Sequence, residues 1–203
     1  MIAGLPRRAV IAILAAIPAL AVLFAVLTRV MPPLAGYALA LAGYWVLFLV
    51  PMLAWLSWPR VTWRWPTAPL VALQAVLLLG VGWAAIQAFP GGLTAATMAL
   101  VVLAALLNGT LEEAFWRGAL LRGVETARVH VAAWALFVGW HLALLTQAGV
   151  EVTGGAAGLL GGAAFAGAIW SWARWQTGTI GFGVAGHIAL NLLAFTELAA
   201  KNL

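Results

Sequence analysis

Four polar residues stand within otherwise apolar segments and carry the chemistry that this sequence offers: Glu112, His141, His187 and Asn191. A carboxylate, two imidazoles and an amide suit hydrolysis of an amide bond in a partly dry cavity. Glu112 can act as a general base on water, with His141 orienting that water or sharing its proton. His187 and Asn191 can donate hydrogen bonds to the oxyanion of a tetrahedral intermediate.

The first of these residues belongs to an acidic pair followed by an arginine. Glu113 and Arg117 are four residues apart, so they can pair along one helix face, whereas Glu112 points about 100° away. Adjacent carboxylates in a low dielectric do not both ionise cheaply, which leaves Glu112 free to exchange a proton. However, Thr110-x-x-Glu113 is also typical of a capping box that opens an amphipathic helix at the membrane surface. The segment alone leaves both interpretations open.

The two histidines also have interpretations in which they play no catalytic role. His141 follows Phe137 by four residues, and His187 precedes Asn191 by four, which puts the last two side chains on one helix face. A single histidine in an apolar helix is often a packing residue, and histidine with asparagine can simply join helices by hydrogen bonds inside a membrane.

The composition shows which solvent surrounds these groups. The chain has 203 residues, of which 66% are hydrophobic and 7% are charged, and its mean hydropathy is +1.08. Soluble domains carry about 25% charged residues, so lipid must surround most of this chain. We therefore expect an all-α fold, a polytopic transmembrane helical bundle.

The charged and reactive residues exclude several classes of function. The net charge is +5, but the arginines lie between apolar runs and form no single patch, so we expect no nucleic-acid partner. The absence of cysteine excludes disulfides, thiolate metal sites and a cysteine nucleophile. The absence of Asp excludes an aspartyl dyad, and neither serine stands in a G-x-S-x-G motif.

Seven stretches approach the length of about 20 apolar residues that a bilayer requires. They are Ala9–Leu27, Leu34–Leu56, Ala68–Phe89, Thr94–Leu107 with its extension to about Arg122, Val129–Leu145, Ala156–Trp175 and Ile180–Leu198. Connections are expected at Pro32-Pro33, between Trp58 and Pro66, and at Pro90-Gly-Gly92. We interpret the first stretch as a retained span and not as a signal peptide.

The positive charges predict the orientation. With a cytoplasmic N-terminus, one face receives Arg7, Arg8, Arg60, Arg64, Arg122, Arg128 and Arg174, and the other receives Arg29 and Lys201. This bias is the one that the positive-inside rule expects. We predict a multi-pass protein of a bacterial or archaeal inner or plasma membrane.

Depth connects the four polar residues. At 1.5 Å per residue from the cytoplasmic face, Glu112 lies about 15 Å deep, His141 about 18 Å, and His187 and Asn191 about 10 and 16 Å. Each ionisable group at such a depth costs roughly 2.5–3.5 kcal/mol and needs a partner or a cavity. Residues that merely join helices have no reason to share one layer, so the common depth predicts a common site.

The same motifs resemble those of a known family. Glu-Glu-x-x-x-Arg at 112–117, Phe-x-x-x-His at 137–141, His-x-x-x-Asn at 187–191 and the Thr-Gly-Thr-Ile lead-in that ends at Ile180 are similar to the CPBP family. That family comprises CAAX prenyl endopeptidases and bacteriocin-processing or self-immunity membrane proteins, also called Abi proteins.

The resemblance implies a glutamate-dependent intramembrane protease. Glu112 and His141 would be the water-activating pair, His187 and Asn191 the oxyanion-stabilising pair, and Glu113 with Arg117 would orient the site. It implies one intramembrane protease domain over residues 1–203, with a catalytic core at about 94–198. The expected partners are the lipid bilayer and a membrane-tethered protein or peptide, cleaved near its C-terminus or juxtamembrane region. The sequence leaves the oligomeric state and the use of a prenylated substrate open.

Three alternatives remain at this stage. The first is a non-catalytic immunity or regulatory protein of the same fold. The second is a zinc-dependent protease, since a Glu/His/His site with one open position could hold zinc. No H-E-x-x-H motif occurs and asparagine is a poor zinc ligand, so we expect no cofactor. The third is a small transporter, which is disfavoured because the chain has no internal repeat and only one ionisable layer.

Overall fold

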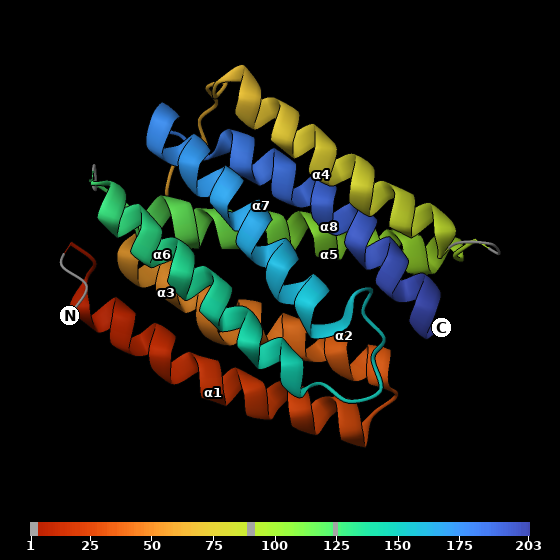
Figure 1. The fold of residues 1–203 in the computed structure, drawn as a ribbon. Coiled ribbons are helices and arrows are strands. Elements are labelled where there is room, and N and C mark those ends of the chain that lie inside the picture. Colours follow the sequence, from red (N-terminus) through yellow and green to blue (C-terminus); the bar gives the residue numbers. More distant parts are fainter. Residues whose placement is uncertain (1–3, 89–91, 124–125) are drawn as a thin grey trace.

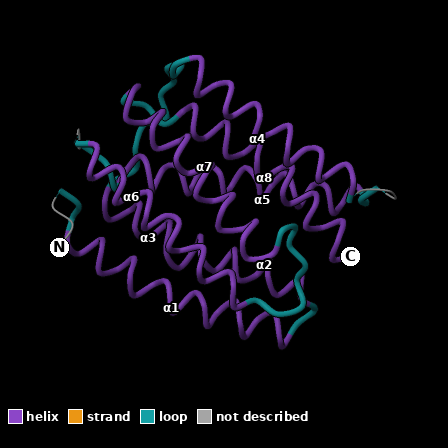
Figure 2. The backbone as a smooth tube through the Cα atoms, in the orientation of Figure 1, coloured by secondary structure: helices purple, strands orange, loops and turns teal. Residues whose placement is uncertain are grey.

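The computed structural model describes residues 4–88, 92–123 and 126–203, and these are mostly helical (Figure 2). The helices are α1 (Arg7–Val30), α2 (Pro33–Tyr44), η1 (Trp45–Leu49), α3 (Val50–Leu56), α4 (Ala68–Gln87), α5 (Ala95–Glu113), η2 (Ala114–Ala119), α6 (Ala127–Trp140), η3 (His141–Thr146), α7 (Gly155–Thr177) and α8 (Gly181–Asn202). The predicted all-α class is confirmed.

Seven continuous helices of the described chain are long and apolar enough to cross a membrane. Three of them are composite, because α2, η1 and α3 form one span, α5 continues into η2, and α6 continues into η3. These seven helices match the seven predicted stretches, and the protein is an integral membrane protein. The predicted connection at Pro90-Gly-Gly92 lies outside the described residues except for Gly92, and so does Phe89, the predicted end of the third span.

Successive spans run in alternate directions across the bundle (Figure 1). The start of α1 therefore lies at the same end as segments 57–67, 120–123 and 178–180, whereas the α1–α2 turn and the C-terminus lie at the other end. The seven arginines that the sequence assigns to one face belong to the first of these ends, which we call the arginine-rich end. That this end faces the cytoplasm stays a prediction.

Polarity in the bundle is the reverse of that in a water-soluble protein. Leu47 and Leu79 are 72% and 73% exposed, whereas Glu113 and Arg117 are 0% and 1% exposed. Large apolar side chains on the outside suit a hydrocarbon surrounding, in which no water can compensate a polar group. The charged side chains are therefore held where other parts of the chain can bind them.

The helix of the fourth span continues without a break through the acidic pair. It begins at Thr94, whose hydroxyl caps the helix by accepting a hydrogen bond from the Thr97 amide at 3.1 Å. Thr110 lies inside α5, so the alternative in which Thr110 caps a new surface helix is wrong. Directly after Glu113 the helix widens into the π-helical η2, with Leu120 bonded to the Phe115 carbonyl five residues earlier. Such π turns are frequent at functional sites.

A close approach of α5 and α8 brings the acidic pair against the last span. α5 and α8 approach at Gly109, where a Cβ atom would stand only 2.7 Å from the backbone nitrogen of Ile188. Small residues allow backbones to approach in this way inside membranes, where packing contacts drive helix association. Gly109 lies one turn before Glu112, and Ile188 directly follows His187, so this contact sets how near those two side chains come.

We expect Gly109→Ala to lower the free energy of unfolding by about 1–3 kcal/mol, because the added methyl group overlaps the α8 backbone. Denaturant unfolding in detergent micelles measures this change. Gly161→Ala is the matched control, since Gly161 is exposed on α7 and a Cβ atom there meets nothing within 4 Å. Equal stability of the two variants would show that the α5–α8 contact tolerates separation.

Candidate active site

A buried ion pair between Glu113 and Arg117 forms the base of the site. The Arg117 Nη1 donates to Glu113 Oε1 at 2.9 Å, as the four-residue spacing predicts. Arg117 also donates to the Gly167 carbonyl at 3.1 Å and to the Ser171 hydroxyl at 3.3 Å, and its guanidinium lies 4.0 Å from the centre of the Phe137 ring. Contacts from α6 and α7 thus fix the arginine, and the arginine fixes Glu113.

His187 connects this ion pair to the second carboxylate. Its Nδ1 lies 3.1 Å from Glu113 Oε1, and its Nε2 lies 3.5 Å from Glu112 Oε2. A carboxylate that is ionised can only accept, so Nδ1 carries the proton of the bond to Glu113. Nε2 is then the ring nitrogen that can exchange a proton with Glu112.

The cluster is neutral when Glu112 and His187 share one ionisable proton between them. Glu113 and Arg117 cancel, which leaves Glu112 and His187. The pair is neutral if Glu112 holds the proton, and it is also neutral if Glu112 is ionised beside an imidazolium. An uncompensated charge at this depth is expensive, so both arrangements are preferred over those that add or remove a proton.

Glu112 itself is enclosed by aromatic side chains. The residue is 1% exposed, and in the described part of the chain neither of its carboxylate oxygens accepts a hydrogen bond of regular geometry. Tyr44 and Trp140 lie beside the carboxyl group. These two rings stack at 3.9 Å between centroids, and the Tyr44 hydroxyl accepts a hydrogen bond from the Trp116 indole at 3.2 Å. The carboxyl group is therefore positioned by packing and left without a fixed partner other than His187.

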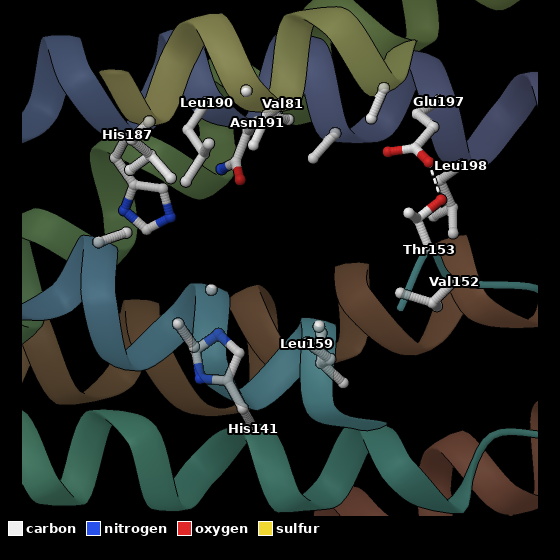
Figure 3. Close-up of a pocket in the computed structure, with 18 of the residues that line it drawn as sticks. Val81, His141, Val152, Thr153, Leu159, His187, Leu190, Asn191, Glu197 and Leu198 are labelled. Atoms are coloured by element: carbon white, nitrogen blue, oxygen red, sulfur yellow. Dashed lines mark hydrogen bonds between the residues drawn. The ribbon is translucent and has the colours of Figure 1, made fainter. Parts of the chain in front are cut away.

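His141 lies at the junction of α6 and η3. Its Nδ1 donates to the Phe137 carbonyl at 2.8 Å, which leaves Nε2 as a hydrogen-bond acceptor in the neutral ring. The ring projects into the space between α6 and α8 (Figure 3). Within the described residues the imidazole paired with Glu112 is that of His187, and no hydrogen bond or ion pair joins Glu112 to His141.

A cavity of about 300 Å³ brings His141, His187 and Asn191 together. His187 and Asn191 project into it from the same face of α8, opposite His141 (Figure 3). The Asn191 Nδ2 is buried and has no hydrogen-bond partner among the described residues, so it is available to an acceptor in the cavity. Glu112 does not line the cavity and lies beside His187 instead.

The cavity continues along α8 toward the end opposite the arginine-rich end. There the Thr153 hydroxyl bonds to the Glu197 carboxylate, as Figure 3 shows. The adjacent loop is also held by Asn202, which accepts from the Glu151 amide at 2.7 Å and donates to the Glu151 carbonyl at 3.0 Å. Loop 147–154 thus borders one end of the cavity and is tied to the last turns of α8.

Two residues that the sequence analysis missed also hold His187 in place. The Trp170 indole stacks on the His187 ring at 4.2 Å and donates to Gln74 Oε1 at 2.8 Å. Gly186 makes room for this bond, because a Cβ atom there would lie 2.7 Å from Gln74 Oε1. Gln74 is a buried amide in an apolar span, which was a signal in the sequence. Trp170 is one of 12 tryptophans, and nothing in the sequence separates it from the others.

A metal site needs several donor side chains that converge on one point. In the described residues, no group of three or more His, Cys, Asp or Glu side chains is placed as a metal ion needs them. The Nδ1 of His187 is in addition bonded to Glu113.

Residues 94–193 match the family model described as type II CAAX prenyl endopeptidase Rce1-like. No curated protein and no solved structure matches the chain. The matched region begins at the capping residue of α5 and ends just after Asn191, so it contains all six residues predicted for the site and none of α1 to α4. The resemblance that the motifs predicted is therefore confirmed over residues 94–193, which are similar to the Rce1-like type II CAAX prenyl endopeptidases, a family of membrane proteases.

Proposed function

We propose that this protein is an intramembrane endopeptidase that uses Glu112 to activate water. The observation that carries this proposal is the contact between the enclosed Glu112 carboxyl and His187, which Glu113 and Arg117 hold from the other side. A carboxyl group without a fixed partner, next to an imidazole with one free nitrogen, is a pair suited to proton transfer.

The proposed reaction begins when Glu112 transfers its proton to His187 Nε2. Glu112 then takes a proton from a water molecule bound beside His187, at the edge of the cavity, as the water oxygen attacks the scissile carbonyl carbon. The π electrons of the carbonyl group move to its oxygen, which becomes negatively charged. The proton taken from water is then on Glu112, so the cluster carries one more proton than before and compensates this charge. Collapse of the intermediate breaks the C–N bond, and Glu112 donates the proton to the leaving amine. His141, with Nε2 as an acceptor in the cavity, would orient the water.

The oxyanion requires donors in the same cavity. Asn191 Nδ2 has no hydrogen-bond partner in the part of the chain that the structure describes, and Asn191 projects into the cavity from α8. His187, one turn earlier, can donate from Nε2 when it is an imidazolium. Donors that are held in place before the reaction stabilise a developing charge without reorganisation, which is often the largest contribution to catalysis.

The position of the cavity suggests the kind of substrate. His141, His187 and Asn191 lie inside membrane-spanning helices, so a substrate must reach them within the bilayer. We infer a membrane-tethered protein or peptide that is cleaved near its C-terminus or juxtamembrane region. We also propose that no cofactor takes part, which chelators and metal analysis of the purified protein can test.

Glu112→Gln keeps the shape of the side chain and removes its basicity, so we expect turnover to fall by about 10³-fold. The assay follows an internally quenched peptide with a lipid-anchored CAAX tail in proteoliposomes, and mass spectrometry identifies the cleaved bond. A matched peptide without the lipid tests the role of the anchor.

Arg128→Gln is the control for that experiment, because it removes a charge from an exposed residue that does not line the cavity. It should retain wild-type turnover, and the unfolding temperatures of both variants should match that of the wild type. Cleavage by Glu112→Gln at the wild-type rate would exclude the base role. An inactive wild-type protein across membrane-tethered peptides would favour a non-catalytic function.

Asn191→Ala removes one donor from the proposed oxyanion site. We expect kcat to fall by about 10²–10³-fold with little change in KM, because the bond forms mainly in the transition state. Steady-state kinetics with the same peptide separates the two constants. A rise in KM at constant kcat would instead show that Asn191 binds the ground state of the substrate.

The bond between Gln74 and Trp170 should influence kcat through His187. We expect Gln74→Leu and Trp170→Phe each to lower kcat by about tenfold, and the double variant to lower it no further, because each single change removes the same bond. KM should stay constant. Independent, additive effects of the two changes would mean that the bond itself does not position His187.

A further inference from the structure

A second pocket, separate from the proposed catalytic site, lies at the arginine-rich end. Its volume is about 470 Å³, and three arginines line it: Arg60, Arg122 and Arg174. Each comes from a different segment, namely the connection between α3 and α4, the turn after η2 and the last turn of α7. Among the described residues that line the pocket there is no carboxylate.

Two of these arginines are fixed by backbone carbonyls and retain unused donors. Arg122 Nη2 donates to the carbonyls of Ser57 and Trp58 at 2.9 and 3.1 Å. Arg174 Nε donates to the Arg117 carbonyl at 2.9 Å, which leaves both of its terminal nitrogens without an acceptor in the described chain. Because a guanidinium carries five N–H donors, each arginine can still bind an anion.

Three cations around one pocket repel one another unless an anion lies between them. A phosphate group suits such a site, because the planar guanidinium fork matches its oxygens in a bidentate manner. The arginines belong to connections at the ends of spans, where lipid headgroups lie. Trp58 lines the pocket and is 52% exposed, and the nearby Trp63 and Trp65 are also exposed, as expected of residues at the membrane interface.

From this arrangement we propose that the pocket of Arg60, Arg122 and Arg174 binds the phosphate headgroup of an anionic membrane lipid. Basic pockets between transmembrane helices are typical sites for such headgroups. This site is independent of peptide hydrolysis, and binding is measured without turnover, so it can be tested whether or not the protease proposal holds.

The experiment uses the full chain, delipidated in a neutral detergent and titrated with short-chain phosphatidylglycerol. Native mass spectrometry counts bound lipid, and the unfolding temperature gives a second readout. We expect one retained lipid per chain and a rise in unfolding temperature. Arg60→Gln should weaken binding by about fivefold, since one cation near a headgroup contributes about that much. The Arg60 side chain makes no hydrogen bond within the described chain, so this variant should fold normally.

Arg128→Gln is the matched control, because it removes the same charge from an exposed residue at the same end, outside the pocket. It should bind phosphatidylglycerol like the wild type. Short-chain phosphatidylcholine and inorganic phosphate identify the source of the phosphate, and both should bind at least tenfold more weakly. Equal binding of inorganic phosphate would overturn the lipid assignment. Unchanged lipid binding by both Arg60→Gln and Arg122→Gln would overturn the site itself.

Discussion

The arrangement of this protein depends on the buried ion pair between Arg117 and Glu113. An arginine that is 1% exposed inside a lipid-embedded bundle must have its donors occupied, and Arg117 uses a carboxylate, a backbone carbonyl and a hydroxyl for this purpose. These partners come from α5 and α7, and Arg117 itself belongs to η2, so the requirement brings the three segments together. Removing one partner of such a pair is costly, because the remaining charge stays buried.

The ion pair also determines which ring nitrogen of the neighbouring His187 carries a proton and which one faces Glu112. Because Glu113 accepts from His187 Nδ1, the opposite nitrogen is directed at Glu112. The family motifs alone suggest a pairing of Glu112 with His141, whereas the contact in the structure is with His187. The two histidines therefore differ in environment: one is bonded to a carboxylate, and the other to the Phe137 carbonyl of its own helix.

The spans outside the family match also contribute to the site. Tyr44 in the second span lies beside Glu112, and Gln74 in α4 holds the indole that stacks on His187. These contacts come from helices whose sequences show little more than hydrophobicity. The proposed site is thus supported by residues that no motif identifies, and these residues act on it through packing and single hydrogen bonds.

Several features followed from the sequence itself. The seven spans were predicted because about 20 apolar residues in a row can hardly be anything else in this composition. The pairing of Glu113 with Arg117 and the common face of His187 and Asn191 were predicted because helical periodicity is local. Even the common depth of the polar residues could be counted, since the helix rise is constant.

Only the tertiary structure decided which residues meet across helices. The sequence could not exclude a helix starting at Thr110, because a capping box and a helix interior use the same residue types. It could not tell that His187, and not His141, contacts Glu112, since rotation of one helix about its axis changes that choice without changing any depth. Contacts such as Trp170 with Gln74 and the gathering of three arginines in one pocket depend on how distant segments pack, which is a property of the whole bundle and of no local pattern.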